Sequence, residues 1–293
     1  MVEVIAGATG FDGLAIAVKA ASYALLLIAS GSVLCPLSVD GVPLKERRFL
    51  HRLAAAIAPV ALALIIARLM LEAVFLAGDD WAAALDTGLL ALVANGALGQ
   101  TLALQAVGLV LIAGGMIRGW TSAALSLIGV VLIAVSFTMS GHVGGTAEWY
   151  DEVLLVLHML CLSFWVGVFL PLYRLSAQPG DAAAVVAEDF GRKAIGVVAV
   201  LVVAGLITLN TLTGGLVAAL QTAYGQLFAA KLGVFVLVLL LAAVNKRALT
   251  PALTNDRPGA GRAMRRSLVV EGSAIALIVV ISATFTTLTG PGG

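Results

Sequence analysis

The chain has 293 residues, of which 61% are hydrophobic and 11% are charged, and its formal net charge is +1. A soluble globular domain is about half apolar and about a quarter charged. The composition therefore excludes a soluble enzyme, a disordered chain and a disulfide scaffold, and the net charge argues against a nucleic-acid binder.

Eight segments are long and apolar enough to span a membrane, which takes about 20 residues of helix. In chain order they are Leu14–Leu34, Leu53–Leu76, Ala97–Ile117, Trp120–Ser140, Val153–Tyr173, Ala194–Thr213, Tyr224–Val244 and Ser267–Leu288. A further apolar stretch, Trp81–Ala94, is interrupted by Asp86 and predicts a short interfacial or re-entrant helix. We therefore expect an all-α polytopic membrane protein with eight transmembrane helices, built as one integral membrane domain over residues 1–293.

The charged residues are sorted between the two ends of these spans. The connections after spans one, three, five and seven hold 14 of the 17 Lys and Arg residues. The other connections and both termini hold only acidic residues: Glu3, Asp12, Asp79, Asp80, Asp86, Glu148, Asp151 and Glu152. By the positive-inside rule, the basic connections are cytoplasmic and both termini lie outside. No phosphate-binding loop is present, so we expect no nucleotide partner, no ATP-driven pumping and no enzyme activity.

Two windows of the chain resemble each other. Leu90–Gly108 and Leu216–Val234 match at many apolar and small positions when Gly99-Gln100 is placed on Gly225-Gln226. This offset places span three on span seven, as in a parallel duplication of four-helix halves. Chance similarity between two helices rich in Ala, Leu and Gly is the alternative.

Several polar side chains lie inside the spans, where they are costly and often functional. They share a level roughly 5–12 Å below the outer surface, at the helical rise of about 1.5 Å per residue. These residues are Lys19, Arg68, Glu72, His158, Asn210 and Lys231. Arg68 and Glu72 are four residues apart and can pair on one helix face. Lys19 and Lys231 could instead extend to the membrane interface.

His158 begins a helix face that also carries Cys161 and Trp165. Met139 and His142 lie where span four ends, and a short connection returns the chain to span five, so the two histidines can approach each other. Imidazole, thioether and thiolate ligands suit copper. We therefore treat His142, His158, Met139 and Cys161 as candidate copper ligands, with a structural core histidine and a small buried cysteine as the alternatives.

Acidic residues surround the entrance to this hairpin. Glu148, Asp151 and Glu152 lie in or beside the connection between spans four and five. Such a charge raises the local concentration of cations. This pattern favours a cation that approaches from outside, although an ordinary solvated loop would have the same composition.

The chain resembles the CopD/PcoD family of inner-membrane copper-resistance proteins. The resemblance is best over residues 136–291 and is looser over residues 1–135, where it rests on Lys19, Gly31 and the interfacial segment. In the second half it rests on the order and spacing of Ser140-Gly141-His142, His158, Trp165, Gly167, Pro171, Phe190-Gly191, Ala194, Gly205, Thr222, Tyr224-Gly225, Lys231, Asn245-Lys246-Arg247, Pro251, Arg265-Arg266-Ser267 and Glu271.

The resemblance implies a multi-pass protein of the bacterial inner membrane that is linked to copper resistance or copper uptake. It implies a periplasmic copper carrier of the CopC type as a partner, beside the lipid bilayer. It places His142 and His158 on the family's histidines, and Lys231 and Glu271 on its membrane-embedded charges. The chain lacks the methionine-rich outer segments of a high-capacity copper store.

Three functions remain open from the sequence. The first is a copper-handling membrane protein that binds Cu(I) or Cu(II) near the outer face and moves it inward without ATP. The second is a carrier of b-type haem or a quinone-linked electron carrier, in which a haem would need His142 and His158 as axial ligands. The third is a non-catalytic assembly or chaperone protein.

Overall fold

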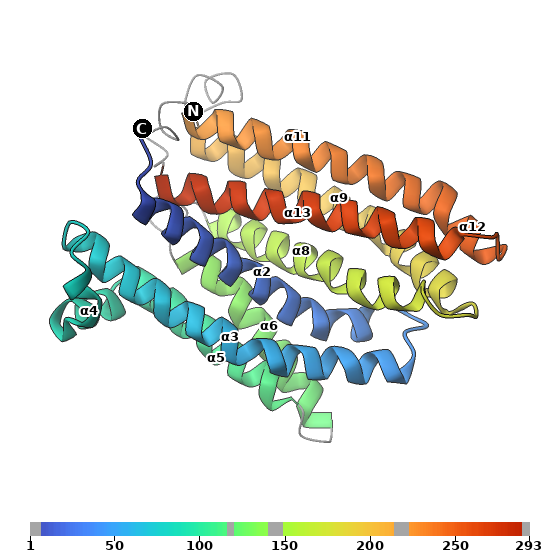
Figure 1. Ribbon diagram of the computed structural model, residues 1–293, viewed down its shortest axis with the longest axis horizontal. Helices are drawn as coiled ribbons and strands as arrows, with labels where there is room; N and C mark the ends of the chain where they lie inside the picture. The colour runs from blue at the N-terminus through green and yellow to red at the C-terminus, as the bar shows by residue number, and fades with distance from the viewer. Residues whose placement is uncertain (1–6, 116–119, 140–148, 214–222, 289–293) are drawn as a thin grey trace.

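Helices make up the described part of the structure, a computed structural model that covers residues 7–115, 120–139, 149–213 and 223–288. No strand occurs within these residues, which confirms the predicted all-α class. In chain order the elements are α2 (Gly10–Ser38), α3 (Leu44–Leu76), η1 (Trp81–Leu85), α4 (Thr87–Asn95), α5 (Ala97–Gly114), α6 (Trp120–Met139), α8 (Trp149–Leu175), α9 (Ala182–Thr213), α11 (Ala223–Val244), η2 (Asn245–Leu249), α12 (Thr250–Thr254) and α13 (Ala260–Leu288). The long helices lie side by side in one bundle (Figure 1).

Seven of these helices are long and apolar enough to cross a membrane. They coincide with seven of the eight predicted spans. The remaining predicted span corresponds to α6, whose described apolar part, Ala123–Met139, is shorter. A polytopic membrane protein is therefore supported, and the count of eight spans stays a prediction.

Several helices extend well beyond the predicted spans. α3 begins at Leu44 and α13 at Ala260, so the basic residues that directly precede the predicted second and eighth spans, among them Arg48, Arg52 and Arg265, are helical. α9 likewise begins at Ala182. Hydropathy marks only the apolar length of a helix, whereas Lys and Arg are good helix formers and continue it into the polar region.

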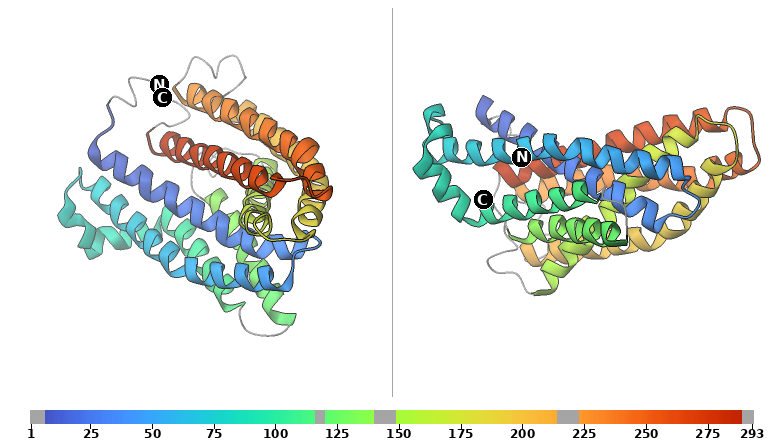
Figure 2. Two further views of the ribbon diagram at one scale, coloured as in Figure 1. Left: turned by 45° about the vertical axis from the view of Figure 1, so that its right-hand side comes forward. Right: turned by 90° about the horizontal axis from the view of Figure 1, so that it is seen from below.

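The short segment after α3 is helical, as predicted, and it is divided into two pieces at Asp86. A 3₁₀ turn, η1, is followed by α4, and Asp86 lies between them. The Asp86 carboxylate accepts hydrogen bonds from the backbone N–H groups of Gly88 and Leu89, at 2.8 and 2.9 Å, and so caps α4. α4 projects from the bundle at the end where α2 begins (Figures 1 and 2).

Glycines bring two pairs of helices into backbone contact. A Cβ atom on Gly31 of α2 would lie 2.7 Å from Cα of Gly167 on α8. Gly108 of α5 and Gly129 of α6 approach each other in the same way. Small residues at such crossings are how helices pack closely inside a membrane. The α2–α8 crossing fixes the position of α8, which carries His158 and Cys161, two of the four predicted metal ligands.

The two halves of the chain pair their helices in a related order. α2 packs on α3 and α5 on α6, while α8 packs on α9 and α11 on α13. The two halves also contact each other in corresponding ways: α6 packs on α8, and α13 packs on α2. Among the described residues, the contact of α3 with α5 has no counterpart of similar extent between α9 and α11. A parallel duplication would produce the matching contacts named first. The duplication itself stays a prediction.

The described basic connections, those after α2, α8 and α11, lie at one end of the bundle, opposite the end where α2 begins (Figure 1). The Glu46 carboxylate is buried and pairs with Arg174 at 2.8 Å. The buried Asp189 carboxylate accepts a hydrogen bond from the backbone N–H of Asp40 at 2.8 Å and pairs with Arg192 and Lys193. These contacts tie the start of α9 to the turn between α2 and α3, so acidic side chains neutralise part of the basic end.

Candidate functional site

The predicted metal ligands fall partly outside the described residues. His142 and Glu148 lie in the segment 140–148, and the side chain of Asn210 also lies outside the described part. Met139 is at the end of α6 and is 37% exposed. The approach of His142 to His158 therefore stays a prediction. Within the described residues, no group of three or more His, Cys, Asp and Glu side chains is arranged to hold a metal ion.

His158 lies half-buried on α8 near a second helix that carries a cation. Its imidazole and the ammonium group of Lys231 on α11 are close enough to interact electrostatically. The Lys231 Nζ atom lies 5.8 Å from the ring centroids of both Phe228 and Phe285, within the range of cation–π contacts. Sequence analysis placed His158 and Lys231 at one level, and the structure brings them within electrostatic range of each other.

Cys161 follows His158 on the same face of α8. Its thiol is free and half-buried, and the residue packs against the apolar cluster that contains Trp165. That cluster also includes Leu201 of α9 and Val238 of α11. The His158–Cys161–Trp165 face therefore points into the second half of the bundle rather than toward lipid.

Lys19, Arg68 and Glu72 form a polar group where α2, α3 and α13 meet. Lys19 Nζ donates a hydrogen bond to the Thr286 carbonyl oxygen at 3.0 Å and interacts electrostatically with Arg68 and Glu72. Arg68 is buried, and its guanidinium contacts neutral partners on other helices rather than Glu72. It donates to Gln105 Oε1 at 3.3 Å and lies 5.4 Å from the centroid of the Tyr23 ring. We call Lys19, Arg68, Glu72, His158 and Lys231 the polar level.

The predicted acidic entrance is described only at the start of α8. Asp151 is buried in the first helical turn, whereas Glu152 is exposed. Acidic residues in the first turn of a helix interact favourably with its dipole. Glu152 is therefore the described residue of this group that is available to solvent cations.

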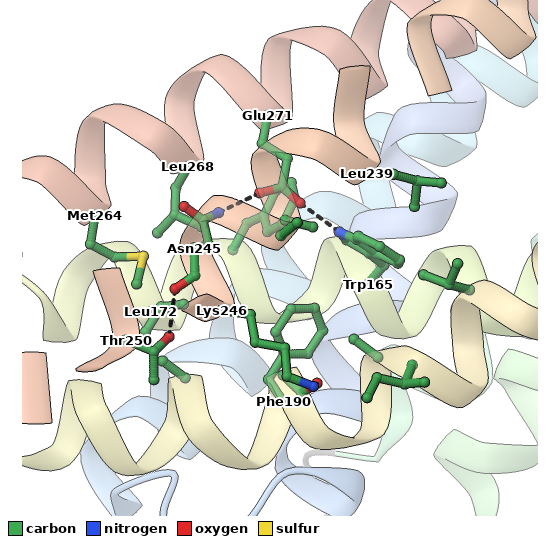
Figure 3. Close-up of a pocket in the computed structure, with 18 residues that line it drawn as sticks. Trp165, Leu172, Phe190, Leu239, Asn245, Lys246, Thr250, Met264, Leu268 and Glu271 are labelled. Carbon is green, nitrogen blue, oxygen red and sulfur yellow. Dashed lines mark hydrogen bonds between the residues drawn. The ribbon is translucent and has the colours of Figure 1, made fainter. Parts of the chain in front are cut away.

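A buried carboxylate that sequence analysis did not assign to the site lies deeper in the bundle. Glu271 of α13 is 1% exposed, and both of its oxygens accept hydrogen bonds from neutral donors. Trp165 Nε1 donates to Oε1 at 2.8 Å, and Asn245 Nδ2 donates to Oε2 at 2.7 Å (Figure 3). No ion pair joins Glu271 to a basic side chain of the described chain. Sequence analysis placed Trp165 on the helix face of His158 and Cys161, and the structure shows that its N–H is bonded to Glu271.

Local sequence explains how Asn245 reaches Glu271. α11 runs into a π-helical turn, η2, in which the Thr250 N–H and hydroxyl both donate to the Asn245 carbonyl oxygen. Pro251 follows and has no N–H to continue a regular α-helix. Single π-helical turns are frequent at functional sites. The turn directs the Asn245 amide toward α13.

A cavity of about 290 Å³ opens beside this carboxylate. It lies between α8, α9, α11, η2, α12 and α13, and its wall is mostly apolar (Figure 3). Polar or soft groups on the wall include Glu271, Asn245, Lys246 and Met264. Lys246 Nζ donates to the Gly191 carbonyl oxygen at 2.8 Å. We call this space the Glu271 cavity.

The sequence contained signals for this site. Glu271 is a lone carboxylate inside a predicted span and matches a family position, and Trp165 belongs to the motif that follows His158. Neither signal shows that the two side chains meet, because they are 106 residues apart in the chain.

Comparison with known families bears on the helices around this cavity. Residues 184–285 match the family model of CopD, copper resistance protein D. The match confirms the resemblance to the CopD/PcoD family and links the chain to copper resistance. The matched residues, here called the CopD segment, include nearly all of α9 and α13 and the whole of α11, η2 and α12. Searches of curated proteins and of solved structures gave no match.

Proposed function

We propose that this membrane protein binds copper at the polar level and moves it across the bilayer without ATP. The observation that supports this most is the direction of one face of α8. His158 lies in electrostatic range of Lys231, and Cys161 packs against the cluster that includes Leu201 and Val238. Lys231, Leu201 and Val238 belong to the CopD segment, whereas His158 and Cys161 precede it. Nitrogen and sulfur donors thus face the part of the chain that is related to copper resistance proteins. Met139 and His142 are the further ligands that we propose from α6 and the connection after it.

The charge distribution supports an inward direction. With the basic connections in the cytoplasm, both termini and the polar level lie toward the periplasm of the bacterial inner membrane. A potential that is negative inside favours inward movement of a cation by about 2.3 kcal/mol per charge for each 100 mV. Uptake then needs no nucleotide, and copper is the cargo of the protein rather than its resident cofactor.

The exposed acidic residues at the same end support a delivery partner. Glu152 is exposed at the entrance, and Asp79 and Asp80 are exposed in the turn that follows α3. We propose that a periplasmic copper carrier of the CopC type releases its ion there. Negative charge at the entrance raises the local concentration of the ion before it reaches His158.

Copper binding by the purified protein tests this function. The full chain is incubated with Cu(I) kept reduced by ascorbate, unbound metal is removed, and the metal bound per chain is measured for wild type and His158→Ala. We expect the variant to bind one copper ion fewer than wild type. His51→Ala is the matched control, because His51 is exposed in the basic first part of α3, and it should bind as wild type does.

Two results would contradict the function. One is a wild-type protein that binds no copper, and the other is a His158→Ala variant that binds as much as wild type. A visible absorption spectrum of the same sample tests the haem hypothesis, since a haem protein would show a Soret band.

A further inference from the structure

The Glu271 carboxyl group is buried between helices without a cationic partner. Trp165 and Asn245 supply one N–H donor each, and within the described residues no Lys or Arg lies within ion-pair distance of its oxygens. Burial favours the neutral acid, whereas N–H donors favour the charged form. Because these effects oppose each other and no fixed cation holds the charge, a proton is the simplest partner that can neutralise this group.

Few titratable groups face this carboxyl group. The residues that α8, α9, α11 and α12 contribute to the wall of the Glu271 cavity carry no titratable side chain. From η2, Lys246 lines the wall, and its ammonium group donates to the Gly191 carbonyl oxygen at 2.8 Å. The lysines of α2 and α11, Lys19 and Lys231, lie at the polar level instead.

The next charged or titratable groups along the neighbouring elements have other surroundings. Asp189 of α9 pairs with Arg192 and Lys193, and the Arg265 guanidinium of α13 lies 5.8 Å from the centroid of the Tyr173 ring. Arg247 of η2 is exposed, and Cys161 of α8 lies one helical turn from Trp165. The protonation of Glu271 is therefore governed by its two N–H donors, by its burial and by any charge that enters the bundle.

The Asn245 amide can hold either protonation state of Glu271. In the structure Asn245 Nδ2 donates to Glu271 Oε2 at 2.7 Å, and Asn245 Oδ1 is buried without a hydrogen-bond partner among the described residues (Figure 3). Rotation of the amide by half a turn places Oδ1 opposite Oε2, where it accepts from the O–H group of the protonated acid. The observed distance is typical of a charge-assisted N–H···O bond and of an O–H···O bond. Trp165 donates to Oε1 in both states, so a proton can bind with no further movement.

The Glu271 cavity gives this proton a route to solution. Its volume of about 290 Å³ is enough for several water molecules, and its wall reaches Lys246, which is exposed near the basic end of the bundle. When the acid ionises, the O–H bond at Oε2 breaks, a water molecule in the cavity takes the proton as hydronium, and the bonding electrons stay on the carboxylate. Proton exchange therefore takes place toward the basic end.

An ion at the polar level would act on this equilibrium. His158 and Trp165 lie on one face of α8, and seven residues of helix cover about 10 Å. One unit of charge at each end of such a distance changes a binding constant by about tenfold at an effective dielectric constant of about 20. A cation near His158 thus favours the carboxylate over the acid, and by linkage the carboxylate favours binding of the cation to the same extent.

We infer that Glu271 is a proton-binding site, and that it releases its proton toward the basic end when copper binds at the polar level. Asn245 turns with the proton and Trp165 holds the carboxyl group in place, so both are positioning residues. This inference rests on the proposed copper function and adds a proton step to it.

Infrared difference spectroscopy of the purified full chain tests whether Glu271 binds a proton. A protonated carboxyl group has a C=O stretching band that disappears on ionisation. As the pH is raised, we expect wild type to lose one such band that Glu271→Gln lacks at every pH. Glu188→Gln, at an exposed carboxylate of α9, is the matched control and should keep this band. If Glu271→Gln lacks no band, or if the band does not titrate while the protein is folded, the inference is wrong.

Asn245→Asp decides the question if Glu271→Gln does not fold. Two adjacent carboxyl groups hold a shared proton to a higher pH than one carboxyl group does. The band should therefore titrate at a higher pH in this variant than in wild type. Titration at an unchanged pH would show that the proton does not lie beside Asn245 and would contradict the inference.

Proton release on copper binding tests the coupling. Cu(I), kept reduced, is added to the weakly buffered protein, and a pH indicator counts the protons released. The Gln side chain has the shape of the protonated acid, so a purely structural network would tolerate Glu271→Gln. We expect this variant to release fewer protons per bound copper than wild type. It should also bind Cu(I) about tenfold more weakly than wild type at alkaline pH and equally at acidic pH. Protons lost by ligands such as His158 and Cys161 are released by both proteins and cancel in the comparison.

The outcomes separate the two proposals. Equal proton release and equal pH dependence in wild type and Glu271→Gln, with copper binding that still depends on His158, would overturn the proton step and leave the proposed function intact. A wild-type protein that binds no copper would overturn the function and the coupling together. Copper binding that depends on His158, with a proton released only when Glu271 is present, is the result that we expect.

Discussion

The polar level and the Glu271 cavity are two buried charged regions of one bundle, and they carry opposite charges. At the polar level, Lys19, Arg68 and Lys231 outnumber Glu72, and they rest on carbonyl, amide and aromatic groups. In the cavity, a single carboxylate rests on two N–H donors. Both regions therefore stabilise charge with neutral dipoles supplied by other helices.

The difference has a consequence for a mobile cation. At the polar level the ion must bind beside Lys231, which repels it, so binding there depends on ligand atoms such as those of His158. In the cavity the carboxylate would instead attract a cation, and the neighbouring Lys246 is held at Gly191.

Trp165→Phe should produce the largest effect on stability, because it removes the N–H donor and keeps an aromatic ring. Leaving Glu271 Oε1 without its buried partner should lower the free energy of unfolding by about 2 kcal/mol. Thermal unfolding of the detergent-solubilised protein measures this. Trp149→Phe, at a side chain that is 74% exposed, should leave the midpoint unchanged. Equal midpoints for Trp165→Phe and wild type would mean that the carboxylate does not depend on this donor.

Lys231→Met tests the repulsion between this lysine and an ion bound at the polar level. Removing the cation near His158 removes a repulsion, so Cu(I) should bind the polar level severalfold more tightly, about 1 kcal/mol in binding free energy. Competition with a chromogenic Cu(I) chelator measures the affinity. Lys45→Met is the matched control, because Lys45 is exposed in the first turns of α3. A weaker affinity in Lys231→Met would show that this lysine supports the ligands instead of opposing the ion.

Glu152→Gln should have the smallest effect. It removes one exposed charge at the entrance, so the rate of Cu(I) uptake should fall by less than about twofold at physiological salt, and the difference should shrink as salt is added. Uptake by proteoliposomes at two salt concentrations measures both. A fall as large as that of a ligand variant, or one that salt does not reduce, would contradict a role limited to attracting cations.

The sequence was sufficient for the helical class and for most of the spans. Hydropathy and charge sorting are local patterns, and seven of the eight spans that they predicted are long apolar helices in the described residues. They also predicted a short helical segment around Asp86. They did not predict that α3 and α13 continue through the basic segments, because charge marks the membrane boundary and not the end of a helix.

The site was less predictable because its residues are distant in the chain. His158 and Lys231 could be placed at one level by counting residues along their spans. The contact of Trp165 with Glu271 joins α8 to α13, and the amide of Asn245 reaches Glu271 from a π-helical turn beside a basic pair. At the sequence level Asn245 had the features of a span end, next to Lys246 and Arg247, and nothing local indicated that it faces the interior.

Flux of Cu(I) into proteoliposomes under an imposed potential, negative inside, tests the central claim most directly. Protease is added outside the proteoliposomes. It cleaves chains whose basic end faces outward, so that chains whose basic end faces the lumen remain intact. We expect copper to accumulate faster than in empty liposomes, and faster still as the potential is increased. Entry at the same rate as in empty liposomes, in a preparation whose chains are folded and correctly oriented, would contradict the claim that this protein moves copper.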